Sequence, residues 1–168
     1  MTIEEQYNRA KNRLNGRLFA PYQMEGVLYL LTMENQTSGP KSCILADEPG
    51  MGKTIQLIAT MLGNPKKSTL IVVPKSIITQ WTNEIRKFAP QLSVHVFDGP
   101  KRHLKEADIV IMPYSLLSTT EDTPIHRHTW DRVILDEGHE IRNKSSKLFK
   151  SVCKLKSDIR CIVTGTPV

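Results

Sequence analysis

The sequence predicts an α/β fold in which helices cover both faces of a mostly parallel, twisted sheet. Short apolar runs alternate with amphipathic stretches along the chain, which is the order expected when helices cover a parallel sheet. One further run alternates apolar and polar residues, as an edge strand does. The length of 168 residues is enough to bury most apolar surface in a single core, so one domain is expected.

The apolar runs give the strands. Five of them are strand candidates, at residues 42–46, 69–73, 108–112, 132–136 and 160–164. Residues 92–97, LSVHVF, form the alternating run, and we place this strand nearer an edge of the sheet.

Apolar residues at helical spacing give the helices. They recur every three or four positions in four stretches, at residues 3–14, 21–31, 55–62 and 77–88. Pro21 suits the first turn of the second helix. The remaining segments rich in polar and turn residues are expected to be loops, at residues 37–41, 64–67 and 119–129.

Composition excludes several classes of protein. With 39% hydrophobic and 24% charged residues, no apolar run approaches the roughly 20 residues that cross a bilayer, so we expect no membrane span. The first residues lack the apolar segment of a secretory signal. Cys43, Cys153 and Cys161 show no metal-ligand spacing, which favours free thiols in a reducing, intracellular compartment. The net charge of +6 favours a polyanionic partner without identifying one.

The stretch ADEPGMGKT, residues 46–54, predicts a phosphate-binding turn between a strand and a helix. Gly50 and Gly52 allow a tight turn whose N–H groups point inward, at the positive end of the new helix. Lys53 would reach the β and γ phosphates of a nucleotide, and the Thr54 hydroxyl would ligate Mg²⁺. Asp47 stands where the usual pattern has its first Gly, so a glycine-rich turn with a surface lysine remains the alternative.

A second signal lies in RVILDEGHEIRN, residues 132–143, where an apolar strand runs into Asp136 and Glu137. Open α/β sheets bind ligands at the carboxyl ends of their strands. There Asp136 can hold the Mg²⁺ that bridges the terminal phosphates, and Glu137 can orient or deprotonate the attacking water. A solvated acidic turn is the alternative, but it is weakened because both signals occur together, each at the end of an expected strand.

The chain resembles the Swi/Snf-type ATPases of helicase superfamily two, whose motifs recur in order from Leu18 to Pro167. The motifs are LFAPYQMEGVLYL, DEPGMGKT, LIVVPKSIITQWTNEIRKF, IVIMPYSLL, DEGH and CIVTGTP. DEPGMGKT is close to the family's own phosphate loop, which also starts with Asp, so Asp47 is a family trait. DEGH is a variant of the DEAH box, and DEGHEIRN is most similar to the branch of helicase-like transcription factor and its DNA-repair relatives.

The resemblance implies a RecA-like P-loop lobe over residues 18–168, preceded by an N-terminal helical extension at 1–17. It implies binding of ATP and Mg²⁺ and contact with the backbone of double-stranded DNA, along which family members translocate. The nucleotide-binding residues it implies are Gln23, Asp47, Glu48, Gly50, Met51, Gly52, Lys53 and Thr54. Lys53, Asp136 and Glu137 are the implied catalytic residues, with Thr54 and Asp136 toward the metal.

The resemblance also implies two further groups of functional residues. The first would face DNA and comprises Pro74, Lys75, Ser76, Tyr114 and Ser115. A helix cap at Ser76 and a packing role for Tyr114 are the alternatives. The second would couple hydrolysis to movement through hydrogen bonds of His139 with Thr164 and Thr166, beside Gly165. Gly138 replaces the usual Ala, and the lost methyl is expected to loosen this turn slightly.

Two other side-chain patterns have plain interpretations. The sequence HRH at residues 126–128 lacks partners at metal-ligand spacing and is expected to be a solvated loop. Trp81 and Trp130 are expected to pack between helix and sheet rather than to stack on bases.

The sequence stops at Val168, directly after the TGTP motif, so the second RecA-like lobe of the family is expected to be absent. That lobe supplies arginine fingers, whose loss lowers turnover by about 10³ to 10⁵. We therefore expect an ATPase lobe of a DNA translocase, in chromatin remodelling or DNA repair, that hydrolyses ATP very slowly by itself and is nuclear if eukaryotic. The alternatives are a non-enzymatic nucleotide- or DNA-binding module and a P-loop phosphotransferase.

Overall fold

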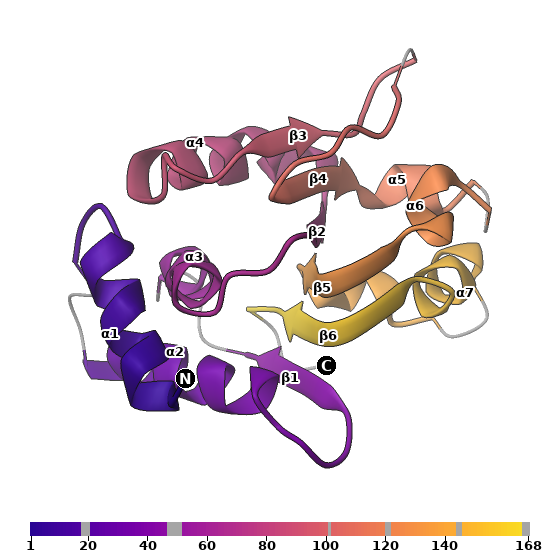
Figure 1. Cartoon of the computed structure of the whole chain (residues 1–168). Coiled ribbons are helices and arrows are strands. Elements are labelled where there is room, and N and C mark those ends of the chain that lie inside the picture. Colours follow the sequence, from indigo (N-terminus) through magenta and orange to yellow (C-terminus); the bar gives the residue numbers. More distant parts are fainter. Residues whose placement is uncertain (18–20, 47–51, 101, 120–121, 144–145, 166–168) are drawn as a thin grey trace.

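The computed structural model describes residues 1–168 except 18–20, 47–51, 101, 120–121, 144–145 and 166–168 (Figure 1). The described residues contain one sheet, whose strands are β1 (Lys41–Leu45), β2 (Thr69–Val73), β3 (Val94–Val96), β4 (Ile109–Pro113), β5 (Thr129–Asp136) and β6 (Lys156–Val163). Their spatial order is β1-β6-β5-β2-β4-β3, and each neighbouring pair is parallel. This confirms the predicted parallel sheet and the edge position of residues 92–97.

The four predicted helices are also present, together with shorter ones. The longer helices are α1 (Ile3–Arg13), α2 (Pro21–Glu34), α3 (Lys53–Gly63) and α4 (Ile78–Phe88). The shorter elements are α5 (Tyr114–Leu117), α6 (Pro124–Arg127), α7 (Lys147–Cys153) and the 3₁₀ turns η1 (Lys75–Ile77) and η2 (Gly138–Ile141). No helix in the described part of the chain is long and apolar enough to cross a membrane.

The prediction of a loop at residues 119–129 was wrong in part. This segment contains α6, and β5 already begins at Thr129. Thr123 caps α6 because its hydroxyl accepts a hydrogen bond from the His126 amide, and Pro124 occupies the first turn. A cap and a proline at the first turn can start a helix too short to show amphipathic periodicity, and periodicity was the signal that predicted the longer helices.

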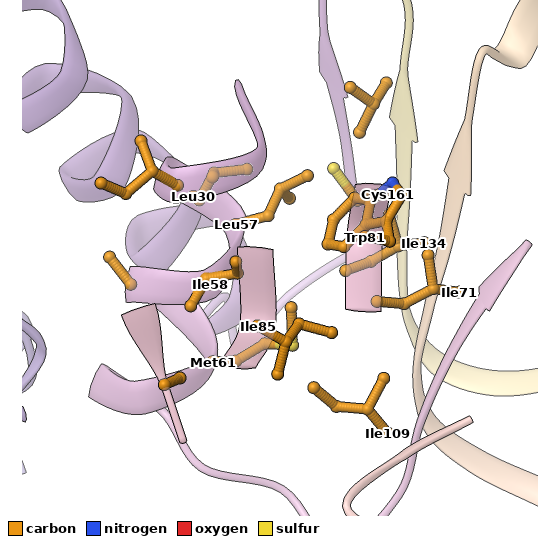
Figure 2. Packing of buried hydrophobic residues seen from close by; sticks show 14 of the residues in the cluster. Leu30, Leu57, Ile58, Met61, Ile71, Trp81, Ile85, Ile109, Ile134 and Cys161 are labelled. Atoms are coloured by element: carbon orange, nitrogen blue, oxygen red, sulfur yellow. The ribbon is translucent and has the colours of Figure 1, made fainter. Parts of the chain in front are cut away.

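Two hydrophobic clusters cover the two faces of the sheet. α1, α2, α3 and α4 pack on one face, where Trp81, Ile71 and Ile134 are among the buried residues (Figure 2). α5, α6 and α7 contribute to the other cluster, around Val133 and Trp130. Successive residues of β2 and β5 therefore face opposite clusters, as expected for central strands of a doubly covered sheet.

The N-terminal segment packs as part of the lobe rather than apart from it. α1 starts with a capping box between Thr2 and Glu5, and it lies against α3. A β-carbon at Gly63 in α3 would lie 2.6 Å from the Gln6 carbonyl oxygen, so the two helices approach closely there. Because Ala10 is fully buried in the cluster on this face, residues of the 1–17 extension contribute to the main core.

A buried ion pair that the sequence analysis missed joins α2 to β5. Arg132 donates to both carboxylate oxygens of Glu34, at 2.8 and 2.6 Å, and the two side chains are 2% and 5% exposed. Further hydrogen bonds extend the pair: Arg132 donates to the Asn64 carbonyl and the Thr69 hydroxyl, and Asn64 donates to Glu34. This network fixes the helix that carries Gln23 against the sheet.

Candidate nucleotide site

The carboxyl ends of β1 and β5 bring the two predicted chemical motifs to the same edge of the sheet. A cavity of about 520 Å³ opens there. Residues of the phosphate-binding motif and of the acidic motif line it together, namely Gly52, Lys53, Thr54, Asp136 and Glu137. Gln23 and Gly165 line the same cavity. The described residues of the two motifs therefore face one space, as expected for a nucleotide site.

Gly52 is the position in this site where any side chain would strain the backbone. Its φ is 73°, in the left-handed region that glycine adopts without steric cost, and it directly precedes α3. A β-carbon at Gly52 would also collide with the amide nitrogen of Gln23. Gly52 and Gln23 are thus packed against each other, and Gln23 itself is 8% exposed.

The first turn of α3 presents Lys53 and Thr54 to the cavity. Both side chains are half-buried. Helix N-termini leave backbone N–H groups without partners within the helix, and the helix dipole adds positive potential there. The end of α3 that faces the cavity is therefore suited to an anion, with an ammonium group beside it.

Asp136, which lines the same cavity, is held in a fixed orientation. The Trp81 indole N–H donates to Oδ2 at 2.7 Å, and the Glu137 amide donates to Oδ1 at 2.8 Å. The Tyr114 hydroxyl donates to the Asp136 carbonyl oxygen at 2.7 Å. Burial, followed by the negative charge of Asp136, raises the pKa of Tyr114 far above its usual value. Tyr114 therefore stays a protonated donor.

Glu137 has a backbone conformation that non-glycine residues rarely adopt. Its φ and ψ are 53° and 51°, in the left-handed region, and it precedes η2. Such a conformation costs on the order of 1–3 kcal/mol and persists only where surrounding contacts impose it. Here it lets the backbone turn sharply after Asp136, so that both carboxylate-bearing residues line the cavity.

His139 does not make the contacts that the resemblance implies within the described residues. Its Nδ1 lies 3.4 Å from Oε2 of Glu137 without hydrogen-bond geometry, and its Nε2 lies 3.9 Å from Oε1 of Glu140. Thr164 is fully buried, and its amide donates to the Leu45 carbonyl at 3.1 Å. Gly165 lines the cavity. The ring of His139 thus faces carboxylates, with Glu137 the nearer.

The expected loosening at Gly138 is not what the structure has. A β-carbon at this position would collide with Cγ2 of Ile162 on β6. The space that an alanine methyl would need is therefore already occupied by a neighbouring side chain, and Gly138 itself is buried.

The residues predicted to face DNA divide into two kinds. Lys75 and Ser76 are exposed on η1, and Ser115 is exposed on α5. Tyr114, in contrast, is 5% exposed and bonded to Asp136, so its side chain takes the packing alternative rather than a surface position. Neither η1 nor α4 has a side-chain cap, which removes the alternative of a helix cap at Ser76.

Lys75 and the half-buried Pro74 follow β2 directly, and Ser115 lies just beyond β4. Val73 and Pro113 are paired in the register of these two parallel strands, so the exposed groups emerge side by side. The Lys75 ammonium lies 3.6 Å from a carboxylate oxygen of Asp98. This ion pair is largely exposed on the lysine side and is easily exchanged for another anion.

The expectation of a solvated HRH segment was wrong for His126. Its side chain is 5% exposed, Nδ1 lies 2.9 Å from the Thr123 hydroxyl and Nε2 lies 2.9 Å from the Ser151 hydroxyl. His126 therefore joins α6 to α7. Trp130 packs in the core as predicted, with its N–H donating to the Ile125 carbonyl at 3.0 Å.

α4 and η1 supply a part of the cavity wall that the sequence did not predict. The additional lining residues are Ile77, Gln80, Trp81, Glu84 and Phe88. The periodicity that predicted the helix was the available signal, but it does not tell which side faces a cavity. The predicted residues Asp47, Glu48, Gly50, Met51 and Thr166 lie outside the described residues.

Comparison with known proteins agrees with this geometry. The family model of the SNF2-related domain matches residues 22–168. The chain belongs to this family. Among curated relatives, the ISWI chromatin-remodeling complex ATPase ISW1 of Saccharomyces cerevisiae is 31% identical over 99% of this chain. The putative ATP-dependent helicase/translocase YwqA of Bacillus subtilis is 37% identical over 88% of it.

Solved structures of the SNF2 family share the fold. The Sulfolobus solfataricus SWI2/SNF2 ATPase core in complex with double-stranded DNA superposes with a TM-score of 0.83 and 34% identity, over 92% of this chain and 33% of that one. This chain spans 16% of ISW1 and 17% of YwqA, and it corresponds to the N-terminal lobe region of the SNF2 domain. The resemblance to Swi/Snf-type ATPases and the RecA-like fold are thereby confirmed.

Proposed function

We propose that this chain is the ATP-binding lobe of a DNA-dependent ATPase that translocates along double-stranded DNA. The observation that carries the proposal is the convergence of Gly52, Lys53 and Thr54 with Asp136 and Glu137 on one cavity. These groups follow two separate strands, and a helix end suited to anions that shares a cavity with paired carboxylates is suited to a metal-bound triphosphate. The family's relatives are ATPases and helicases, which supports hydrolysis over phosphotransfer to a small molecule.

Each side chain has a distinct role in this proposal. Lys53 contacts the terminal phosphates, and the Gln23 amide beside Gly52 contacts the base. Thr54 and Asp136 hold Mg²⁺, because a hydroxyl and a carboxylate are the hard oxygen ligands that this ion prefers. When bound, Mg²⁺ neutralises charge on the phosphates. Glu137 orients the attacking water and accepts its proton.

Double-stranded DNA is proposed to bind across the ends of β2 and β4. Lys75, Ser76 and Ser115 are exposed there, and a lysine with hydroxyl groups suits phosphate contacts that do not depend on sequence. The DNA complex of the Sulfolobus solfataricus SWI2/SNF2 core supports this partner. Chromatin is the proposed setting in a eukaryotic nucleus, because ISW1 is named as a chromatin-remodeling ATPase.

Rapid hydrolysis is proposed to require a second RecA-like lobe. In the proposed mechanism ATP lies between two lobes, and arginine fingers from the second stabilise the transition-state charge. The isolated chain is then a binding module for nucleotide with very slow turnover. Binding, rather than hydrolysis, is therefore the property to measure on this chain.

Titration of the chain with a fluorescent ATP analogue in Mg²⁺ tests the nucleotide site. Lys53→Ala removes the ammonium group at the helix end and should weaken nucleotide binding by about tenfold or more. This factor corresponds to the loss of one hydrogen bond to a charged group, which contributes about 1.5–3 kcal/mol. Lys150→Ala is the matched control, because this lysine is exposed on α7. Equal affinities of the native chain and Lys53→Ala would refute the site.

DNA binding is tested separately, with a short mixed-sequence duplex. Lys75→Ala should lower affinity and reduce the dependence of log Kd on log salt by about one unit of slope, as for the loss of one phosphate contact. Lys150→Ala again serves as the control. An unchanged slope would remove Lys75 from the DNA interface while leaving the nucleotide site standing.

A further inference from the structure

Asp136 receives hydrogen bonds from two elements that lie outside both nucleotide motifs. Trp81 on α4 holds its Oδ2 at 2.7 Å, and Tyr114 at the start of α5 holds its carbonyl oxygen at 2.7 Å. Trp81 is 2% exposed and Tyr114 is 5% exposed, so both donors are held in the packed interior. The position of the carboxylate therefore depends on where α4 and α5 lie.

The surface proposed to bind DNA lies on α5 and on η1, the turn that leads into α4. Lys75 and Ser76 lie on η1, which runs directly into α4, and Ser115 follows Tyr114 within α5. Val73 and Pro113, which precede these segments, are paired across parallel strands. A ligand that fixes η1 and α5 at the surface would thus fix the two donors that orient Asp136 beneath it.

We propose that Trp81 and Tyr114 are positioning residues that connect duplex DNA at η1 and α5 to the metal-holding carboxylate of Asp136. The inference rests on the proposed function and adds the route of coupling to it. DNA stabilises the arrangement in which indole and phenol both donate to Asp136. The chain then binds Mg-nucleotide more tightly in the presence of DNA, and by linkage it binds DNA more tightly in the presence of Mg-nucleotide.

The coupling is measured as a ratio of dissociation constants. The Kd of the full chain for a fluorescent nonhydrolysable ATP analogue is determined in Mg²⁺ at one fixed salt concentration. The coupling ratio is the Kd without duplex DNA divided by the Kd with saturating duplex DNA. Coupling between sites in proteins is typically about 5–150-fold, and we expect the native chain to fall in this range. In EDTA the ratio should fall to one, because the route acts through the residue that holds the metal.

Tyr114→Phe removes only the hydroxyl that reaches Asp136, and Trp81→Phe removes the indole donor. Both should bring the ratio toward one while duplex DNA still binds. Tyr29→Phe, on the exposed face of α2, and Trp130→Phe, in the other core cluster, are the matched controls and should retain the native ratio. Circular dichroism of each variant checks folding, and Tyr114→Phe tests the route by itself if Trp81→Phe does not fold.

The outcomes separate this inference from the proposed function. If nucleotide and DNA both bind but the native ratio is one, or if Tyr114→Phe keeps the native ratio, the coupling route is refuted and the binding sites stand. If the native ratio persists in EDTA, the route does not run through Asp136 and is likewise refuted. If the native chain binds neither ligand, the proposed function fails and the coupling fails with it.

Discussion

Gly138 of η2 and Ile162 of β6 occupy complementary space. A β-carbon at Gly138 would collide with Cγ2 of Ile162, so the glycine in DEGH and the isoleucine in CIVTGTP fit each other. The resemblance expects an alanine at residue 138, and in this chain the isoleucine fills the room that the alanine methyl would take. The two motifs are thus packed together directly beside Glu137.

Gly138→Ala should destabilise the chain by about 1–3 kcal/mol, the usual cost of an added methyl in a filled site. Ile162→Ala removes Cγ2, so the double variant should lose less free energy of unfolding than the two single variants together. Urea unfolding of the four chains completes the cycle. Strict additivity would show that the collision is relieved elsewhere.

Glu137→Gln should preserve nucleotide binding and lower ATP turnover by about 10²–10⁴, because the amide cannot accept a proton from water. Turnover is measured by phosphate release in a preparation that also contains the second lobe, and affinity by titration of this chain. Glu140→Gln on η2 is the matched control, since its side chain is 45% exposed. Native turnover in Glu137→Gln would exclude Glu137 as the general base.

Glu34→Gln should lower the free energy of unfolding by about 3–5 kcal/mol, because it leaves the buried guanidinium of Arg132 without its counter-charge. Asp158→Asn breaks the exposed pair with Lys41 and should cost at most about 1 kcal/mol. Urea unfolding compares the two variants. Similar small losses would mean that Arg132 is neutralised in another way.

Gly63→Ala is expected to destabilise the chain, although alanine in a helix interior is more favourable than glycine by about 1 kcal/mol. The new methyl would meet the Gln6 carbonyl of α1 at 2.6 Å, and overpacking of this kind costs about 1–3 kcal/mol. In a chain that starts at residue 18 the obstacle is gone, and the same substitution should stabilise. Thermal unfolding reads the sign in each background. Stabilisation in both would show that α1 does not pack closely on α3.

The three cysteines should differ in reactivity. Cys153 is exposed, whereas Cys43 and Cys161 are buried and paired in the register of β1 and β6. Hydrogen bonding to the Cys43 thiol, and then burial, raise the pKa of Cys161 well above its usual value. A thiol reagent should label Cys153 in the folded chain and the other two only on unfolding. Rapid labelling of all three would contradict the packing.

The raised pKa of Cys161 makes the free energy of unfolding depend on pH, with a defined sign. Above pH 9.0, the usual thiol pKa, the unfolded chain releases a proton that folded Cys161 keeps. The folded state then binds more protons than the unfolded state, so the free energy of unfolding falls as pH rises past this value. Cys161→Ser, followed by urea unfolding across this range, should flatten the decline.

Much of the fold and of the site follows from local patterns in the sequence. Apolar runs predicted the strands of the parallel sheet, and the alternating run predicted β3 at its edge. Gly52, Lys53, Asp136 and Glu137 were predicted to share a site because parallel strands deliver their carboxyl ends to one edge, and they line one cavity. Backbone direction and side-chain type suffice for these predictions, since both are encoded within a few residues.

Contacts between distant segments required the tertiary structure. The indole of Trp81 reaches Asp136 across 55 positions of sequence, and Arg132 reaches Glu34 across 98. Periodicity showed that Trp81 is buried but not which acceptor its N–H finds, and nothing local marked Tyr114 as a donor to Asp136 or His126 as a core residue. Hydrogen-bond partners and filled volumes depend on the packing of whole elements, and that packing exists only once the chain has folded.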